Sequence, residues 1–309
     1  MVELETVSNW EEIKKLLIEL KENDKIFCPL SPEHYLETSQ KDIEKARIHD
    51  EFLNNLSNGF SFKPELFITS QLISSKIRKN NITLKTYLYE NVNNVFCKEE
   101  NYKTFKKSNE KLAELLTEAT SGINQIRTIV PNQNIEPKTK RTMINAMNSL
   151  RANSFIQRLE ELLTNDNIII RGDQIGKTEV PNWIDLIIDQ LLKKHKFNKK
   201  EVIKLIAEFK ANGFSNIPTL NISTTLQSYM SIYSKKEHSN DHIDLMRIST
   251  GLPISDILLT DKKRKAELIE SELGKKYKTK IFAGTKSDLE ELITELNKIK
   301  TAHNNSYKQ

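Results

Sequence analysis

The sequence predicts an α/β protein whose parallel sheet is split by a long helical insertion. Short apolar runs alternate with helical patterns at both ends of the 309-residue chain, whereas the middle is almost wholly helical. Such alternation is typical of parallel strands joined by helical crossovers. We therefore expect one domain in two parts, residues 1–64 and 216–309, separated by an insertion at residues 65–215. Two independent domains in tandem are the alternative.

The first part should form a helix, a strand and another helix. Apolar residues recur at helical spacing in WEEIKKLLIEL (10–20), and the run KIFCPL (25–30) has the length of a short buried strand. The Ser-Pro pair that follows is a typical helix start, which predicts a helix over residues 32–56. Glu37 would then lie near the start of this helix, close to the end of the strand.

The middle of the chain has the apolar spacing of helices almost throughout. Three-to-four spacing extends from about residue 65 to residue 235, with polar breaks at 78–82, 131–139 and 165–182. Only IIIRG (168–172) has the composition of a strand in this region.

The last part returns to the alternating pattern. It should contain a helix at 241–250, a strand at ILLT (257–260), a helix at 262–273, a strand at TKIFA (279–283) and a helix at 286–300. Open α/β sheets place their ligand sites at the carboxyl ends of the strands. The residues that follow these strands are therefore the first candidates for a functional site.

Composition restricts the class of protein more than its function. The chain has 47 Lys and Arg against 42 Asp and Glu, so its net charge of +5 permits nucleic-acid binding without establishing it. Its two cysteines, Cys28 and Cys97, form no disulfide or metal-binding pattern. No apolar run approaches the length of a membrane span, and the start MVELE lacks the features of a secretory signal. We expect a cytoplasmic protein with no membrane association.

Four acidic residues are candidates for a metal site. Asp241 and Asp244 are three residues apart at a predicted helix start, so they project from nearly the same face. Asp261 directly follows the ILLT strand, and Glu37 lies close to the end of its own strand. Carboxylates gathered at one sheet edge repel one another unless a hard cation such as Mg²⁺ or Mn²⁺ stabilises them. Such a cation could activate water for attack on a phosphodiester.

Each of these residues also has a structural explanation. Asp241 and Asp244 can stabilise the first turn of a helix, and Asp261 can cap the next helix. Glu37 can be a solvated surface residue. Asp256 precedes the ILLT strand and therefore lies at its opposite end, where we expect a structural role. Spacing does not by itself decide between the two explanations.

Two other features are weaker candidates for a site. His238 and His242 are four residues apart, but the residues between them are typical of a helix start, which argues against a histidine metal site. The run KKRK (262–265), with further lysines up to Lys280, is most simply a solvated helix face. If the acidic site exists, these cations would lie where they could hold a phosphate backbone.

Two stretches together resemble bacterial PIN-like nuclease domains. The segment CPLSPEHYLET (28–38) is similar to the second strand and helix of these domains, whose acidic residue corresponds to Glu37. The segment NDHIDLMRISTGLPISDILLTDKK (240–263), with the later strand TKIFAG (279–284), is similar to their carboxyl-terminal half. In that half, the helix start matches Asp241 and Asp244, and the strand with its flanking residues matches Asp256 and Asp261.

The resemblance implies a three-layer α/β fold with a parallel sheet, and hydrolysis of RNA that depends on Mg²⁺ or Mn²⁺. It assigns Glu37, Asp241 and Asp261 as metal ligands and catalytic residues, and it gives Asp244 an assisting catalytic role. By analogy, we expect a toxin or defence effector that binds RNA. A regulatory protein partner and a homo-oligomeric state are further expectations.

One feature of the family is absent from the sequence. PIN domains begin with a strand that ends in an aspartate, and MVELETVSNW contains no such strand. We expect this strand to lie upstream of Met1. A degenerate copy that has lost the strand is the alternative.

Three functions are compatible with these patterns. The first is a metal-dependent ribonuclease. The second is a catalytically inactive PIN-like module that binds nucleic acid or protein. The third is a mostly helical interaction protein whose acidic residues are helix caps, which predicts carboxylates of Glu37, Asp241 and Asp261 farther than about 10 Å apart.

Overall fold

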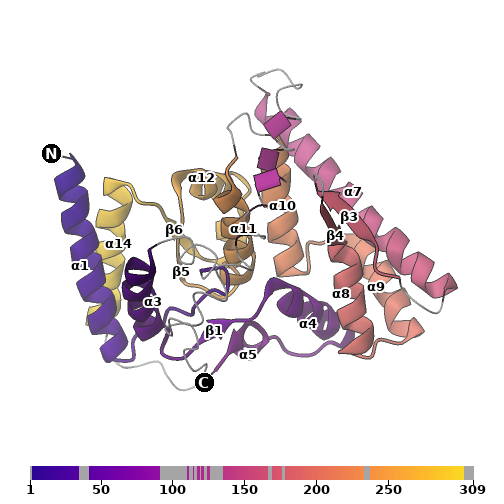
Figure 1. The fold of residues 1–309 in the computed structure, drawn as a ribbon, viewed down its shortest axis with the longest axis horizontal. Coiled ribbons are helices and arrows are strands. Elements are labelled where there is room, and N and C mark those ends of the chain that lie inside the picture. Colours follow the sequence, from indigo (N-terminus) through magenta and orange to yellow (C-terminus); the bar gives the residue numbers. More distant parts are fainter. Residues whose placement is uncertain are drawn as a thin grey trace.

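Helices dominate the fold in the computed structural model of the chain (Figure 1). The structure describes residues 2–34, 42–90, 135–165, 169–175, 178–232 and 237–302, with a few single positions between residues 110 and 125. Within these residues there are twelve helices and three two-stranded sheets. They contain no three-layer parallel sheet, so the predicted fold class is wrong.

The helices follow one another along the chain with few interruptions. Before the predicted site they are α1 (Val2–Glu22), α3 (Ile43–Ser57), α4 (Glu65–Arg78), α5 (Leu84–Tyr87), α7 (Pro137–Thr164), α8 (Trp183–Lys193), α9 (Lys199–Asn212) and α10 (Pro218–Ile232). The remaining ones are α11 (Ser239–Gly251), α12 (Lys262–Glu270), α13 (Leu273–Tyr277) and α14 (Lys286–Thr301).

The strands are short and pair only two at a time in the described part of the chain. β1 (Ser61–Phe62) pairs antiparallel with β2 (Leu88–Tyr89), and β3 (Gly172–Ile175) pairs antiparallel with β4 (Thr178–Pro181). β5 (Ile257–Leu259) and β6 (Lys280–Phe282) form the one parallel pair among the described strands, in which Leu258 is opposite Ile281.

The predicted strand at residues 25–30 does not form. Pro29 has no backbone N–H and cannot donate to a sheet ladder. Leu30 instead makes a single parallel bridge to Ser61, with its N–H 3.0 Å from the Phe60 carbonyl oxygen. Because β1 pairs with both Leu30 and β2, this small assembly stays separate from β5 and β6 in the described structure.

The predicted strands at residues 257–260 and 279–283 are confirmed as β5 and β6. Each has three residues, and no other described strand extends the pair. Two such strands bury too little surface to organise helices into layers on both faces. The helices therefore pack mainly on one another.

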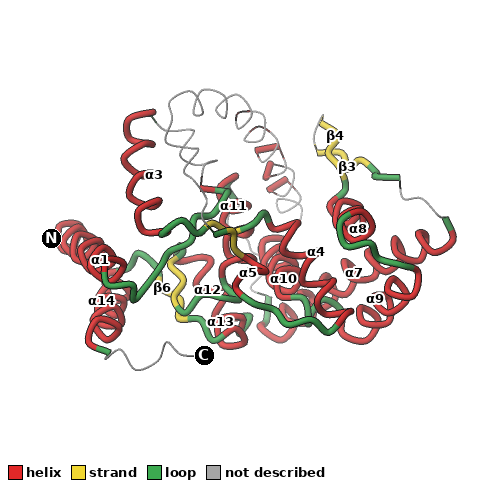
Figure 2. The backbone as a smooth tube through the Cα atoms, turned by 90° about the horizontal axis from the view of Figure 1, so that it is seen from below, coloured by secondary structure: helices red, strands yellow, loops and turns green. Residues whose placement is uncertain are grey.

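Three clusters of buried apolar side chains hold the helices together. The largest joins α4, α7, α8 and α9 around residues such as Phe155. A second joins α10, α11 and α12 through Leu226, Ile248 and Leu268, and a third packs α1 on α14 through Leu20 and Leu289. Figures 1 and 2 both place α1 and α14 side by side at one end, with α7, α8 and α9 at the other.

Most predicted helices of the last part are confirmed. Those at 241–250 and 286–300 correspond to α11 and α14. The one at 262–273 divides into α12 and α13, because Glu272 between them has a positive φ of 57°. None of the described helices combines the length and apolarity needed to cross a membrane.

Two predictions for the earlier parts need correction. The helix expected over residues 32–56 is described only as α3, which begins at Ile43 and is capped by the Asp42 side chain; residues 35–41 lie outside the described part. The strand expected at IIIRG (168–172) begins only at its last residue, as β3.

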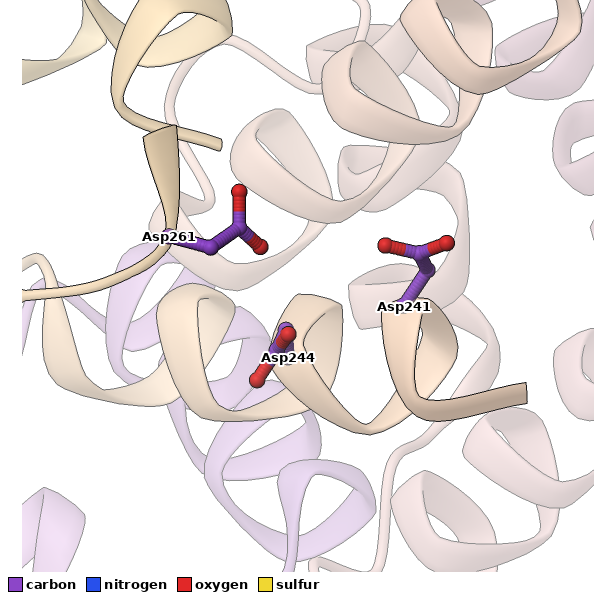
Figure 3. Close-up of side chains that lie close together, drawn as sticks. All are labelled: Asp241, Asp244 and Asp261. Carbon is purple, nitrogen blue, oxygen red and sulfur yellow. The ribbon is translucent and has the colours of Figure 1, made fainter. Parts of the chain in front are cut away.

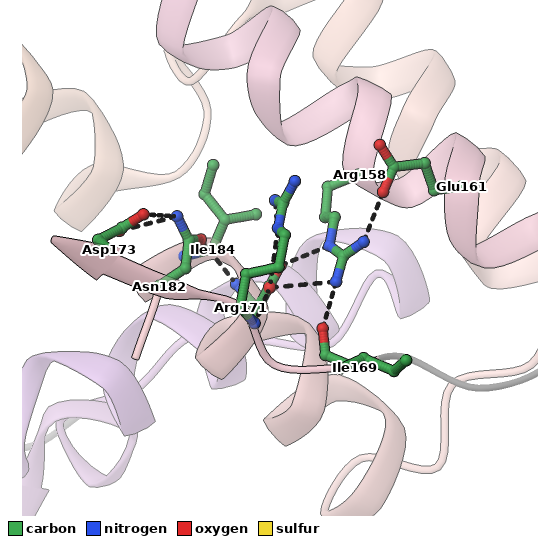
Figure 4. A network of polar contacts seen from close by, with 8 residues as sticks. Arg158, Glu161, Ile169, Arg171, Asp173, Asn182 and Ile184 are labelled. Carbon is green, nitrogen blue, oxygen red and sulfur yellow. Dashed lines mark hydrogen bonds and ion pairs between the residues drawn. The ribbon is translucent and has the colours of Figure 1, made fainter. Parts of the chain in front are cut away.

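A buried carboxylate anchors the β3–β4 hairpin to the helices. Asp185 on α8 is fully buried and accepts hydrogen bonds from Arg158 Nε at 2.6 Å and from the Arg171 N–H at 2.8 Å. Figure 4 shows the two arginines converging from α7 and from the residue before β3. Burial acts to raise the pKa of Asp185, but the hydrogen bonds from Arg158 and Arg171 outweigh it and lower the pKa below its ordinary value.

Replacing Asp185 by Asn should destabilise the protein strongly. Loss of the carboxylate leaves the largely buried Arg158 guanidinium with only the half-exposed Glu161 as counter-charge, and breaking a buried ion pair on one side typically costs about 3 to 5 kcal/mol. Asp189→Asn is the matched control, because Asp189 lies one turn further along α8 and pairs with the exposed Lys193. Urea unfolding should show a loss below about 1 kcal/mol for the control. Equal losses for the two variants would contradict the anchoring role.

A partly buried contact joins α4 to α11, the helix that carries two residues of the predicted site. The Glu65 carboxylate at the start of α4 accepts a hydrogen bond of 2.8 Å from the Ser249 hydroxyl on α11. Desolvation raises the pKa of Glu65 to about 7, with a further increase from Glu33 that opposes the effect of the Ser249 hydrogen bond. The folded protein therefore holds a proton here that the unfolded chain releases at lower pH.

The free energy of unfolding should decrease as the pH rises because of Glu65. A raised folded pKa contributes stability that is complete below the unfolded value and is lost as the pH rises through about 7. Glu65→Gln, which imitates the protonated form, should become more stable than the wild type by on the order of 1 to 3 kcal/mol between pH 5 and pH 8. Denaturant titrations at both pH values measure this difference. The exposed Glu291→Gln on α14 should show no such trend, and a pH-independent Glu65→Gln difference would refute the expectation.

Candidate metal centre

Three of the predicted site residues lie together in the structure. Asp241, Asp244 and Asp261 each offer a carboxylate oxygen, and these oxygens are all within 4.8 Å of one another. Figure 3 shows Asp241 and Asp244 rising from α11 while Asp261 approaches from the start of the next helix. Asp241 is nearly buried, Asp244 is half-buried and Asp261 is exposed, so the group opens to solvent on one side.

Helix geometry places the first two aspartates. His238 is the N-cap of α11, and its N–H donates to Asp241 Oδ2 at 2.6 Å. Three residues further on, Asp244 projects from nearly the same face, with Arg247 Nη1 at 3.8 Å from its Oδ1. Leu245 and Ile248, one and two turns after Asp241 on nearly the same side of α11, are buried in the cluster with α10, so the acidic group adjoins that apolar cluster.

The end of β5 places the third aspartate. The Thr260 N–H donates to the Phe282 carbonyl oxygen at 2.9 Å, which continues the pairing of β5 with β6 up to Asp261. Asp261 then caps α12, because its Oδ1 accepts from the Arg264 N–H at 2.8 Å. The structural explanation of these residues as caps is therefore confirmed for Asp241 and Asp261, and it coexists with their convergence.

A buried network of charges adjoins the acidic group. Arg264 is fully buried, with Nη2 2.9 Å from Glu237 Oε2 and 3.2 Å from Asp241 Oδ1, while Nη1 contacts Glu267. Lys263 Nζ lies 2.5 Å from Glu237 Oε2 and 3.7 Å from Asp241 Oδ2. Two basic side chains, Lys263 and Arg264, therefore contact the acidic group on its buried side.

These contacts keep Asp241 ionised. Burial acts to raise the pKa of Asp241, but the Glu237 side chain, the His238 N–H, Lys263 and Arg264 outweigh this effect and lower the pKa to about 2. For Glu267, by contrast, burial dominates and raises the pKa to about 7. Asp241 is therefore ionised at every physiological pH.

The group has the geometry and chemistry of a hard-cation site. Metal–oxygen distances of about 2.0 to 2.6 Å place two oxygens on opposite sides of the ion about 4 to 5 Å apart. The 4.8 Å limit for the three aspartates lies within this range. Carboxylate oxygens are the ligands that Mg²⁺ and Mn²⁺ prefer. The residues present therefore fit such a cation.

The other predicted site residues have different outcomes. Glu37 lies outside the described residues. Asp256 is exposed and its main-chain oxygen accepts from the Lys280 N–H at 2.9 Å, so it opens the β5–β6 pair, as predicted. His242 lies beside Asp241, and burial lowers its pKa; its Nε2 has no hydrogen-bond partner among the described residues.

The prediction that the KKRK run is a solvated helix face is confirmed only in part, because Lys262 and the later lysines are exposed whereas Arg264 is buried. Besides the buried Arg264, Lys265 pairs with Asp288 at 2.7 Å, and Lys263 is held by Glu237. Lys262 is exposed, and no ion pair engages it within the described structure. Of the later lysines, Lys276 donates to the Ser215 carbonyl, and Lys280 pairs with Glu295.

Glu237, Arg264 and Glu267 were not among the predicted site residues. Their spacing carries a signal, because Glu237 precedes Asp241 by four residues and Arg264 precedes Glu267 by three. Charged pairs at these spacings are common on solvated helices, however, and this chain is rich in them. The burial that distinguishes these residues is a tertiary property.

Comparisons with protein-family models, with curated proteins and with solved structures found no match for this chain.

Capping and charge at Asp261 can be separated by substitution. Asn caps helices about as well as Asp does, whereas Ala costs about 1 kcal/mol at such a position. In EDTA, where no cation offsets the repulsion between the carboxylates, we expect Asp261→Asn to be at least as stable as the wild type and Asp261→Ala to be about 1 kcal/mol less stable than Asp261→Asn. Denaturant unfolding of the three proteins tests this. Equal free energies of unfolding for the Ala and Asn variants would mean that the Asp261 cap of α12 does not stabilise the protein.

Proposed function

We propose that the protein is a ribonuclease that depends on Mg²⁺ or Mn²⁺, with Asp241, Asp244 and Asp261 as the groups that hold the cation. The observation that carries the proposal is the convergence of three carboxylate oxygens within 4.8 Å, on a side of the molecule that opens to solvent at Asp261. The helical-interaction hypothesis predicted that Glu37, Asp241 and Asp261 lie far apart; Asp241 and Asp261 instead lie together, and Glu37 is outside the described residues.

The residues around the group suit phosphodiester hydrolysis. A bound divalent cation lowers the pKa of a coordinated water and offsets the charge of the phosphate. Asp241 supplies a permanently ionised carboxylate on the buried side. The exposed Lys262, next to Asp261, can attract and hold the phosphate backbone as it approaches from the open side.

The choice of RNA as substrate is supported by the motifs. The segments 28–38 and 240–263 resemble those of PIN-like nucleases, and the second segment contains all three aspartates. The resemblance extends to the order of helix start, strand and cap, which the structure forms without the layered sheet. A role as a toxin or defence effector rests on the same analogy.

Cleavage of RNA should depend on the acidic group and on the cation. With labelled single-stranded RNA and Mn²⁺, Asp244→Asn and Asp261→Asn should each reduce the cleavage rate by at least about 100-fold, or roughly 2.7 kcal/mol in barrier height. Asp256→Asn is the matched control, because Asp256 is an exposed aspartate at the other end of β5. EDTA should stop the reaction. Cleavage at equal rates by the wild type and both variants, or by none of them, would refute the proposal.

A second candidate is a catalytically inactive module that binds nucleic acid or protein. It is favoured by the occupation of Asp241, whose two oxygens already contact Arg264 and the His238 N–H. Calorimetric titration separates the candidates: heat of Mn²⁺ binding that disappears in Asp244→Asn supports the enzyme. Glu37→Gln tests in the same way whether Glu37 is a further ligand. Absence of any heat with the wild type supports the module.

A further inference from the structure

One residue of the structure contacts two of the candidate ligands through different atoms. The Arg264 side chain reaches Asp241 with Nη2 at 3.2 Å from Oδ1, and the Arg264 backbone N–H donates to Asp261 Oδ1 at 2.8 Å. The first contact spans α11 and α12, and the second fixes the cap of α12. We propose that Arg264 is a positioning residue of the metal centre, which sets Asp241 and Asp261 at the separation that a cation requires. This inference rests on the proposed function.

The guanidinium is itself held in a fixed orientation. Nη1 contacts Glu267, and Nη2 lies 2.9 Å from Glu237 Oε2. All three side chains are at most 1 % exposed, so solvent does not compete for these contacts. Glu237 and Glu267 therefore hold Arg264 in place, and Arg264 in turn orients the Asp241 carboxylate.

Stability alone does not explain the network. Moving charges out of water is costly, and a buried ion network of this kind is often no more stable than a well-packed apolar one. Nε of Arg264 and Oε1 of Glu267 are also buried with no hydrogen-bond partner among the described atoms, which adds to the cost. What an apolar side chain could not supply is the directed contact to Asp241. Mutation of a residue that orients a metal ligand in this way typically lowers the metal affinity about 10- to 100-fold.

The shape of the guanidinium provides a test that leaves the charge unchanged. Arginine presents its donors in a planar fork, whereas lysine has a single point charge that cannot contact Glu237, Glu267 and Asp241 in the same geometry. Arg264→Lys therefore keeps the local charge and removes the fixed orientation. Because the charge is constant, a change in cation affinity reports positioning and not electrostatic attraction.

The experiment measures the Mn²⁺ dissociation constant of the full chain by calorimetry, with thermal unfolding in EDTA as the measure of folding. We expect Arg264→Lys to bind Mn²⁺ roughly 10-fold more weakly than the wild type. Lys265→Arg is the matched control: it is the reverse exchange one residue along α12, at a side chain that pairs with Asp288, and it should leave the affinity unchanged. Glu267→Asp, a second charge-conserving variant, withdraws a support of Arg264 without touching an aspartate of the centre, and it should also weaken binding.

The outcomes separate this inference from the proposed function. Wild-type Mn²⁺ binding that persists at full strength in Arg264→Lys and Glu267→Asp would overturn the positioning role and leave the metal centre intact. Lower melting temperatures with unchanged affinity would assign Arg264 a structural role only and would also overturn it. If Arg264→Lys does not fold, the affinity of Glu267→Asp decides. No Mn²⁺ binding by the wild type would overturn both proposals.

Discussion

Compensation of negative charge is the constraint on which the centre depends. Three carboxylates within 4.8 Å repel one another, and the repulsion grows where water is excluded. Lys263 and Arg264 offset it on the buried side, next to Asp241. On the solvent side Asp244 has Arg247 at 3.8 Å, and under the proposed function a divalent cation would complete the compensation there. Since the two basic residues belong to α12 and Asp241 belongs to α11, the same contacts also join these helices above their apolar cluster.

The acidic group could be predicted because local rules place its members. The three-residue spacing of Asp241 and Asp244 follows from the helical period, and the position of Asp261 follows from a strand that ends where a helix begins. Arg264 could not be predicted in the same way. It lies in a run of four basic residues, and its burial depends on Glu237, which belongs to the segment before α11, and on the packing of α10.

The prediction of a layered sheet was wrong because it depended on long-range pairing and not on local rules. Apolar runs indicate where strands can form, but the partner of each strand is a long-range property that the runs do not contain. Leu30 forms a bridge with Ser61, whereas β5 pairs with β6. The motifs at 240–263 nevertheless retained their helix starts and caps, because these depend on neighbouring residues only. A motif can therefore keep its local geometry in a fold that differs from the expected one.

The residues of the centre all come from a single short stretch, Glu237 to Glu267, which contains α11, β5 and α12. Contacts between residues close in sequence require little loop closure and form early when a chain folds. The acidic group and its basic support can thus assemble as one local unit before the distant helices α1 and α14 meet. Its burial still requires α10 and β6, which pack on this stretch from outside it, so these two elements are the part of the remaining chain on which the acidic group depends.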